Sequence, residues 1–189
     1  RRVSLAQPIQ LLEVGCGTGF TAECMAGMCS NYLGIDRAES MIKLARSLER
    51  CPRVQFESAD IRDFESNRRF DVVLLIGVLH HLEDLSSSLA KMVKLLRPGG
   101  WLLANEPHPS NPVVHWLRLL RKRLDRTYCN EQKELAEDEL RRMFKDAGLV
   151  DVRTAPQGWF STPFAEVRLR PRFLTLPAAR IACRLDGVL

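Results

Sequence analysis

The sequence predicts an α/β fold with a doubly wound, mostly parallel sheet. Along residues 10–106, apolar runs alternate with helical patterns, which is the order expected when a crossover helix follows each strand. The run 70–78 is apolar after Asp71 and rich in branched residues, as is typical of a central strand that is covered by helices on both faces. Ligands of such folds bind at the carboxyl ends of the strands, so the residues that follow each strand are the candidates for function.

The apolar and amphipathic patterns assign the elements in order. Strands are predicted over residues 10–15, 31–36, 53–57, 70–77 and 100–106, and helices over 19–28, 38–49 and 84–96. Asp84 is expected to begin the last of these helices as its cap, and Pro98-Gly99-Gly100 to end it. Further along, the patterns predict a helix over 135–147, ended by Gly148, and a strand over 149–154.

Three glycines follow the first predicted strand. Gly15, Gly17 and Gly19 lie in a turn between that strand and a helix, where missing side chains let backbone amides approach a ligand. A plain strand-to-helix turn is the alternative. The binding interpretation is favoured because Asp36 ends the next strand, where an acid accepts hydrogen bonds from both hydroxyls of a ribose. For Asp36 the alternative is an N-cap of the helix that begins near Ala38.

Two nucleotide-binding motifs are absent from the sequence, and their absence narrows the class of ligand. A dinucleotide-binding fingerprint requires a third glycine at the position of Phe20, whose bulk argues against the close approach of a pyrophosphate. The chain also has no phosphate-binding Gly-x-x-x-x-Gly-Lys-Ser/Thr loop. These observations favour a nucleoside ligand without phosphates.

Five segments, in order, resemble the motifs of class I S-adenosylmethionine-dependent methyltransferases, specifically their small-molecule, type 11-like branch. The segments are Glu13-Val14-Gly15-Cys16-Gly17-Thr18-Gly19, Tyr32-Leu33-Gly34-Ile35-Asp36, Ser58-Ala59-Asp60-Ile61, Phe70-Asp71-Val72-Val73 and Leu96-Arg97-Pro98-Gly99-Gly100. The resemblance spans residues 9–106 and implies a Rossmann-like fold that takes S-adenosylmethionine as methyl donor and releases S-adenosylhomocysteine.

The same resemblance implies roles for single residues. Asp36 would bind the ribose, and Asp60 with Ile61 the adenine. Contacts to the methionine part would come from Glu13 and from the backbone near Gly15, Gly17 and Gly77, with Gly19 completing the glycine turn of the same cofactor site.

Two adjacent histidines, His80 and His81, follow the fourth predicted strand and are the candidate catalytic residues. A neutral imidazole at this edge of the sheet can accept the proton of a hydroxyl or of an acidic carbon, because histidine titrates near neutral pH. The alternative is structural, with one histidine packing against the cofactor loop while the other orients it. His108 and His115, in the expected lid, are weaker candidates.

We expect one domain over residues 1–189, because 189 residues with 46% apolar content can bury one substantial core. Within it we assign 1–106 to the cofactor-binding core, 107–148 to a helical lid or substrate region, and 149–189 to a C-terminal strand and tail. Beyond residue 160 the tail shows no clear closing strand, and three prolines interrupt it, which suggests a fold truncated at its C-terminal end. The oligomeric state stays open.

The net charge of +5 lies mainly after residue 105, where the helical pattern 113–124 has an apolar stripe and a basic remainder. Such a helix attracts an anionic or lipid-linked acceptor or contacts a membrane surface; the alternative is a solvated helix face whose stripe packs on the sheet. Nucleic acid is disfavoured because few aromatic residues are interleaved with the basic ones. The six cysteines form no metal-binding pattern and no disulfide framework, which indicates no metal site and a cytoplasmic protein.

The first functional hypothesis is an S-adenosylmethionine-dependent methyltransferase that acts on a small molecule or a lipid or envelope precursor. It would methylate an oxygen, a carbon or a small amine by in-line transfer, since the segment after the fourth strand lacks the Asp/Asn-Pro-Pro-Tyr/Phe motif of enzymes that methylate adenine or glutamine amines. A non-catalytic S-adenosylmethionine-binding or interaction module is the second hypothesis. A nicotinamide-dependent enzyme is the third.

Overall fold

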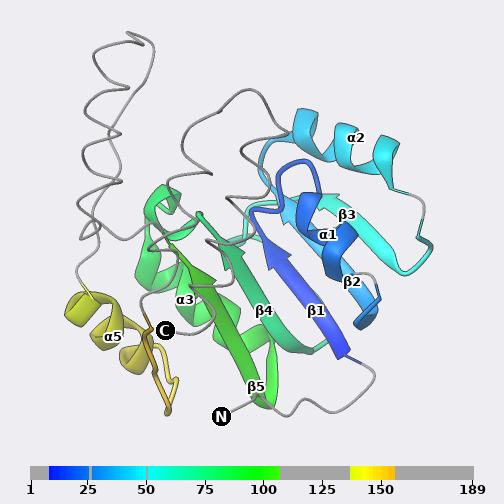
Figure 1. Cartoon of the computed structure of the whole chain (residues 1–189). Helices are drawn as coiled ribbons and strands as arrows, with labels where there is room; N and C mark the ends of the chain where they lie inside the picture. Colours follow the sequence, from blue (N-terminus) through cyan, green and yellow to red (C-terminus); the bar gives the residue numbers. More distant parts are fainter. Residues whose placement is uncertain (1–8, 26, 50, 107–136, 156–189) are drawn as a thin grey trace, which may run out of the picture. The chain divides into compact units, whose positions relative to one another are not determined.

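The computed structural model describes residues 9–25, 27–49, 51–106 and 137–155 (Figure 1). The chain divides into two units, and the first, residues 1–106 with 135–152, contains every strand and helix described below. The expected lid helix over 113–124 and the tail beyond residue 155 lie outside the described residues.

Five parallel strands form one sheet. They are β1 (Ile9–Val14), β2 (Cys29–Asp36), β3 (Val54–Ser58), β4 (Phe70–Ile76) and β5 (Leu96–Asn105). Their order is β3-β2-β1-β4-β5, and every pair of neighbours is parallel. From β1 the chain adds β2 and then β3 on one side of the sheet. It then crosses to the other side of β1, where it adds β4 and β5. This reversal opens a crevice for a ligand at the carboxyl ends of β1 and β4.

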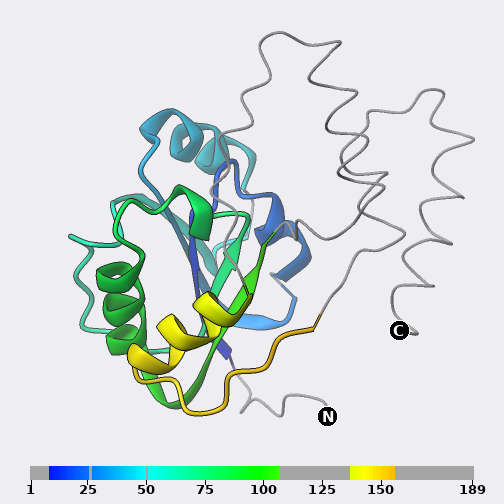
Figure 2. The ribbon, with the colours of Figure 1, turned by 90° about the vertical axis from the view of Figure 1, so that its left-hand side faces the viewer.

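Helices cover both faces of the sheet, as Figures 1 and 2 show. The helices are α1 (Phe20–Met25), α2 (Glu39–Leu48), α3 (Leu85–Leu95) and α5 (Glu137–Asp146), and a 3-10 turn, η1, spans Leu79–His81. The predicted strands and helices of residues 10–106, apart from the start of the last strand, and the helix predicted over 135–147 are therefore confirmed within a few residues at each end. None of the helices in the described part of the chain is long and apolar enough to cross a membrane.

The core has two layers because successive residues of a buried strand face opposite sides of the sheet. Leu12 and Val73 lie in the layer that contains Leu89 and Met92 of α3. Leu11, Tyr32 and Val72 lie in the other layer, which contains Ala22 of α1 and Ile42 of α2. Since both layers are apolar, the central strands carry the continuous apolar runs that the sequence shows, and the doubly wound prediction is confirmed.

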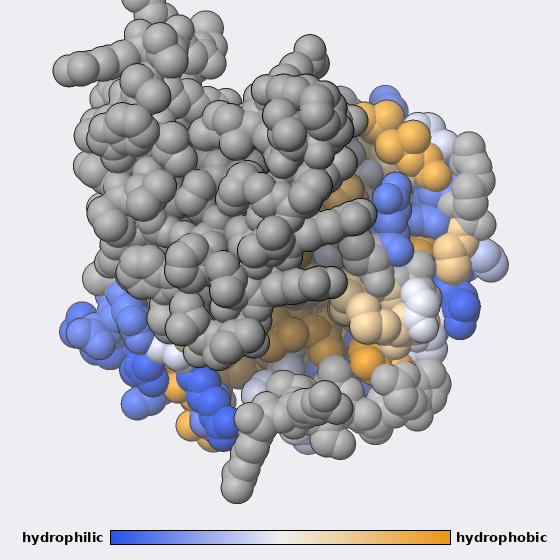
Figure 3. All heavy atoms as spheres, viewed as in Figure 1, coloured by the Kyte–Doolittle hydropathy of each residue, from blue (hydrophilic) through white to orange (hydrophobic). Residues whose placement is uncertain are grey.

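Helix α5, from the region that the sequence assigns to the lid, packs on the α3 side of the sheet. Its apolar residues Leu140, Met143 and Phe144 lie against the α3 layer. Its opposite face is charged and forms the hydrophilic patch at the lower left of Figure 3.

Two expectations are corrected. β5 begins at Leu96 rather than near residue 100, because the turn Pro98-Gly99-Gly100 is absorbed as a bulge between the pairs Phe70↔Leu96 and Val72↔Trp101. The strand predicted over 149–154 is wrong: residues 149–155 are irregular, and Val150 is 97% exposed. The alternation of apolar and polar residues there has no neighbouring strand to pair with in the part of the chain that the structure describes.

Candidate active site

A cavity of about 340 Å³ lies at the carboxyl ends of the central strands. Its wall contains six of the residues singled out in the sequence: Gly15, Asp36, Asp60, Ile61, Gly77 and His81. These residues come from the ends of four different segments, and the parallel order of β3, β2, β1 and β4 brings them together. A second, more open groove of about 680 Å³, beside β3 and α2, contains none of the predicted site residues.

The glycine turn needs its glycines for different reasons. All three have positive φ: 73° at Gly15, 52° at Gly17 and 80° at Gly19. A Cβ on Gly15 would lie 2.5 Å from Val78 Cγ2, and one on Gly19 would lie 2.5 Å from Phe56 Cζ, so the turn packs tightly at both ends. At Gly17 a Cβ would meet nothing within 4 Å. Only Gly15 of the three lines the cavity.

Asp36 connects the glycine turn to α2. Its Oδ2 accepts a hydrogen bond from Gly17 N–H at 2.9 Å, and its Oδ1 accepts one from Ala38 N–H at 2.8 Å. The N-cap of α2 is Ala38. The alternative prediction, in which Asp36 is the N-cap, is therefore wrong. The carboxylate lies in the cavity wall with its position fixed from two sides.

Glu13 is not among the residues that line this cavity. It is 2% exposed, and its carboxylate accepts a hydrogen bond from the Tyr32 hydroxyl. Burial raises the pKa of the Glu13 carboxyl, against the opposing effect of hydrogen bonds from Tyr32 and Thr21. Burial also raises the pKa of the neighbouring Cys16 thiol, to about 12. The contact with the methionine part of the donor that the motif resemblance implies for Glu13 stays a prediction.

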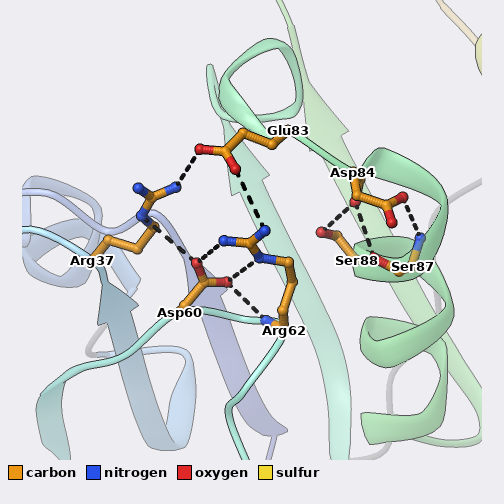
Figure 4. Close-up of polar contacts among 7 residues, drawn as sticks. All are labelled: Arg37, Asp60, Arg62, Glu83, Asp84, Ser87 and Ser88. Carbon is orange, nitrogen blue, oxygen red and sulfur yellow. Dashed lines mark hydrogen bonds and ion pairs between the residues drawn. The ribbon is translucent and has the colours of Figure 1, made fainter.

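Asp60 belongs to a ring of four charged side chains at the cavity wall (Figure 4). Arg62 binds Asp60 most closely, with Nη2 2.8 Å from Oδ2 and Nε 3.1 Å from Oδ1. Arg37 Nε lies 3.6 Å from Asp60 Oδ2, and Glu83 closes the ring with contacts of 3.5 Å to both arginines. The hydrogen bonds from Arg62 are the main reason why the pKa of Asp60 falls to about 2. Asp60 is therefore an anionic acceptor at any physiological pH.

The segment after β4 is held by its own hydrogen bonds. Asp84 caps α3, as the sequence predicts, because its Oδ1 accepts a hydrogen bond from Ser87 N–H at 3.0 Å (Figure 4). The bond from the Ser87 amide lowers the pKa of Asp84. Ser88, whose hydroxyl donates to the Asp84 carbonyl oxygen at 2.7 Å, is buried and lines the cavity.

The two histidines of η1 have different surroundings. His81 lines the cavity, whereas the His80 side chain is only 7% exposed and its Nδ1 lies 2.7 Å from Glu106 Oε2. The rings of the two histidines are in contact, with centroids 4.0 Å apart and planes inclined at 45°. His80 Nε2 is buried without a hydrogen-bond partner among the described residues.

Glu106 was not among the predicted site residues, although it holds this segment in place. Its Oε1 accepts hydrogen bonds from Val78 N–H at 2.7 Å and Leu79 N–H at 2.8 Å, while its Oε2 faces His80. The signal for it was present in the sequence, because Glu106 follows β5 in the way that Asp36 ends β2. Arg37, Arg62 and Glu83 were also missed, since their grouping depends on three loops that meet only in the folded chain.

Comparisons with known proteins agree with this architecture. A family model described as a methyltransferase domain matches residues 12–104, about half of the chain. A ubiquinone biosynthesis O-methyltransferase from Thiobacillus denitrificans is 32% identical over 148 residues, which cover 74% of this chain and 64% of the relative. A phthiotriol/phenolphthiotriol dimycocerosates methyltransferase from Mycobacterium ulcerans is 34% identical over 110 residues, which cover 57% of this chain and 41% of that protein. The chain thus spans less than two thirds of the length of these curated relatives.

A solved structure gives the same result. The S-adenosylmethionine-dependent methyltransferase from Mesorhizobium loti superposes with a TM-score of 0.52 at 25% identity, covering 57% of this chain and 50% of that one. The order of the strands in the sheet agrees with these matches. Over residues 12–104, the chain is similar to the methyltransferase domain family and to S-adenosylmethionine-dependent methyltransferases.

Proposed function

We propose that this protein transfers a methyl group from S-adenosylmethionine to a small-molecule or lipid acceptor and releases S-adenosylhomocysteine. The observation that carries the proposal is the cavity at the switch point of the sheet, where Gly15, Asp36, Asp60, Ile61 and Gly77 lie in one wall. The names of the two curated relatives support the class of acceptor, since one acts in ubiquinone biosynthesis and the other on dimycocerosates.

The cavity fits the nucleoside part of this donor. Each oxygen of Asp36 accepts one backbone hydrogen bond and retains a lone pair for a ribose hydroxyl. Asp60 is kept anionic by Arg62 and is available to accept from an adenine amine, while the buried Ile61 supplies an apolar surface for the base. A cavity of about 340 Å³ lies within the usual range for small-ligand sites, roughly 300–1,000 Å³.

The methionine end would lie toward Gly15 and Gly77. Gly77 has a φ of 65°, and a Cβ there would meet nothing within 4 Å, so the backbone is open to a ligand. When bound, the sulfonium supplies an electrophilic methyl group. The chain's part is to align donor and acceptor and to exclude water, and such alignment lowers a barrier by several kcal/mol in general.

The remaining parts of the proposal concern the surroundings of the protein. Cys16, Cys29 and Cys51 are free thiols, which supports a reducing, cytoplasmic location. Contact of the basic segment 113–124 with a membrane surface, as a route to a lipid-linked acceptor, stays part of the proposal.

Calorimetric titration with S-adenosylmethionine, S-adenosylhomocysteine and NAD tests the donor site. We expect both sulfur compounds to bind and NAD not to bind. Asp36→Ala should weaken binding at least tenfold, whereas Asp63→Ala, at an exposed acid outside the cavity, should bind as the wild type does. Binding of NAD alone would refute the proposal.

Methyl transfer is tested separately, by incubating the protein and methyl-labelled S-adenosylmethionine with small-molecule and lipid extracts. Label is expected in one or a few products. Tight donor binding without any transfer would favour the non-catalytic module instead.

A further inference from the structure

We propose that His80, oriented by Glu106, accepts the proton of a hydroxyl group on the acceptor, so that the protein is an O-methyltransferase whose base is His80 rather than His81. This inference rests on the proposed methyl transfer and deepens it, because it names the acceptor group and adds Glu106 as a positioning residue.

The hydrogen bonds around Glu106 fix its carboxylate. Oε1 accepts from the backbone N–H groups of Val78 and Leu79, at 2.7 and 2.8 Å, which leaves Oε2 directed at His80 Nδ1 at 2.7 Å. A carboxylate accepts hydrogen bonds and donates none, so Nδ1 of the neutral imidazole must carry the ring proton. Nε2 then holds the free lone pair of the ring, which is the form of histidine that accepts a proton.

His80 Nε2 has no donor in the part of the chain that the structure describes, although the atom is buried. Buried polar atoms are nearly always hydrogen-bonded, and a specific exception calls for an explanation. A hydroxyl of a bound acceptor provides one, because its O–H is the donor that this lone pair lacks.

The place of His80 in the fold agrees with this role. Gly77, Val78 and His81 line the cavity, and the His80 ring lies against the His81 ring with 4.0 Å between centroids. His80 therefore lies one ring away from the wall of the proposed donor site. His81 contributes the wall itself, and within the described residues it has no carboxylate to select its tautomer.

The chemistry of the acceptor follows from the base. An amine attacks through its own lone pair and can lose a proton afterwards, whereas a hydroxyl is a weak nucleophile until its proton is removed. In the proposed step the acceptor O–H bond breaks and its proton forms a bond with His80 Nε2. The oxygen takes the methyl group as the methyl–sulfur bond breaks, and the electron pair of that bond stays on sulfur. The resulting imidazolium is stabilised by the Glu106 carboxylate, and it later releases its proton to water.

Glu106→Gln is the discriminating variant. The two backbone N–H donors still require an oxygen, so the amide oxygen should keep the place of Oε1 and the amide NH₂ should face His80 Nδ1. An NH₂ group donates, so Nδ1 must then accept, and the ring proton moves to Nε2. The variant thus preserves the backbone contacts but removes the free lone pair. Glu65→Gln is the matched control, because Glu65 is an exposed acid paired with Lys91 and lies outside the cavity.

The tautomer is read by two-bond ¹H–¹⁵N NMR on protein labelled at histidine, with His80→Gln and His81→Gln to assign the signals. We expect the proton on Nδ1 of His80 in the wild type and in Glu65→Gln, and on Nε2 in Glu106→Gln. A wild-type proton on Nε2 would overturn the proposal whether or not the variants fold. An unchanged tautomer in folded Glu106→Gln would overturn it as well.

The position of the methyl group is the second readout, taken from the labelled product of the transfer experiment. Methyl on oxygen, with transfer reduced roughly 100- to 10,000-fold in both His80→Gln and Glu106→Gln, supports the proposal. Methyl on nitrogen or carbon overturns it while leaving the proposed methyltransferase activity intact. S-adenosylhomocysteine should bind Glu106→Gln within about twofold of the wild type. If neither S-adenosylmethionine nor S-adenosylhomocysteine binds to the wild type, in contrast, the proposed function itself is refuted.

Discussion

The carboxylate of Asp36 accepts a hydrogen bond from the Gly17 N–H at 2.9 Å, so the residue that ends β2 holds the turn that follows β1. The other oxygen of Asp36 holds Ala38 at the start of α2, at 2.8 Å. One side chain therefore positions the glycine turn, the α2 terminus and the proposed ribose-binding edge of the cavity. The acid that we propose as the ribose ligand thus also fixes the shape of the site before any ligand binds.

Asp36→Asn should destabilise the protein without ligand. An asparagine has one acceptor oxygen for two N–H groups, so one of them would face an NH₂ group. We expect the free energy of unfolding to fall by about 1–3 kcal/mol, as for a polar group that loses its partner. Urea unfolding measures this, with Asp63→Asn as the control at an exposed acid. An unchanged midpoint for Asp36→Asn would show that these two bonds contribute nothing.

The glycine turn offers a matched pair of substitutions. Gly17→Ala meets only the strain of positive φ, about 1–2 kcal/mol, because the space around it is open. Gly15→Ala should cost more, since its Cβ would also lie 2.5 Å from Val78 Cγ2. In Gly15→Ala/Val78→Ala that contact is removed, so part of the extra cost should be recovered. Equal costs for both single substitutions in urea unfolding would contradict the packing argument.

Much of this site could be predicted from the sequence, because the motifs lie where single strands end. Gly15, Asp36, Asp60 and Gly77 each follow or end a strand, and parallel strands bring such positions to one edge. Glu106 was missed because its role depends on β5 lying beside β4, which periodicity alone does not reveal.

The strand expected over 149–154 failed for a different reason. Alternation of apolar and polar residues records only that a segment can form a half-buried strand. A strand also needs a partner, and Val150 is instead almost fully exposed. The helix predicted just before this segment is confirmed as α5, because its apolar stripe packs against the α3 layer.

Asp60→Asn should show a pH-dependent loss of stability. Hydrogen bonds from Arg62 lower the pKa of Asp60 from 3.8 to about 2, so folding favours the charged form. The stabilisation is therefore present above pH 3.8 and is lost as the pH falls through about 2. In urea unfolding from pH 7 downward without ligand, the gap between the wild type and Asp60→Asn should narrow in this acidic window. A gap that stays constant with pH would contradict the ion-pair assignment.

The cost of Tyr32→Phe should also depend on pH, through a different carboxylate, Glu13. The substitution removes the Tyr32 hydroxyl, one of the two hydroxyl donors to the buried Glu13 carboxylate, and we expect a cost of about 1–3 kcal/mol at pH 7. Burial already raises the pKa of Glu13, so lowering the pH protonates it while the protein is folded, and the cost should shrink. In a Glu13→Gln background the same substitution should cost less and show little dependence on pH, which urea unfolding at several pH values would test.

Because β5 has a bulge at its start, a change in chain length there need not change the geometry at the other end of the strand. Two steps along β4, from Phe70 to Val72, correspond to five steps along β5, from Leu96 to Trp101, yet the register from Trp101 to Asn105 is regular. Length differences at that end of the strand can therefore be absorbed far from Glu106. Gly99, with open space where a side chain would be, is a natural place to insert a short peptide tag or a fluorophore attachment site while the edge of the sheet that lines the cavity stays in place.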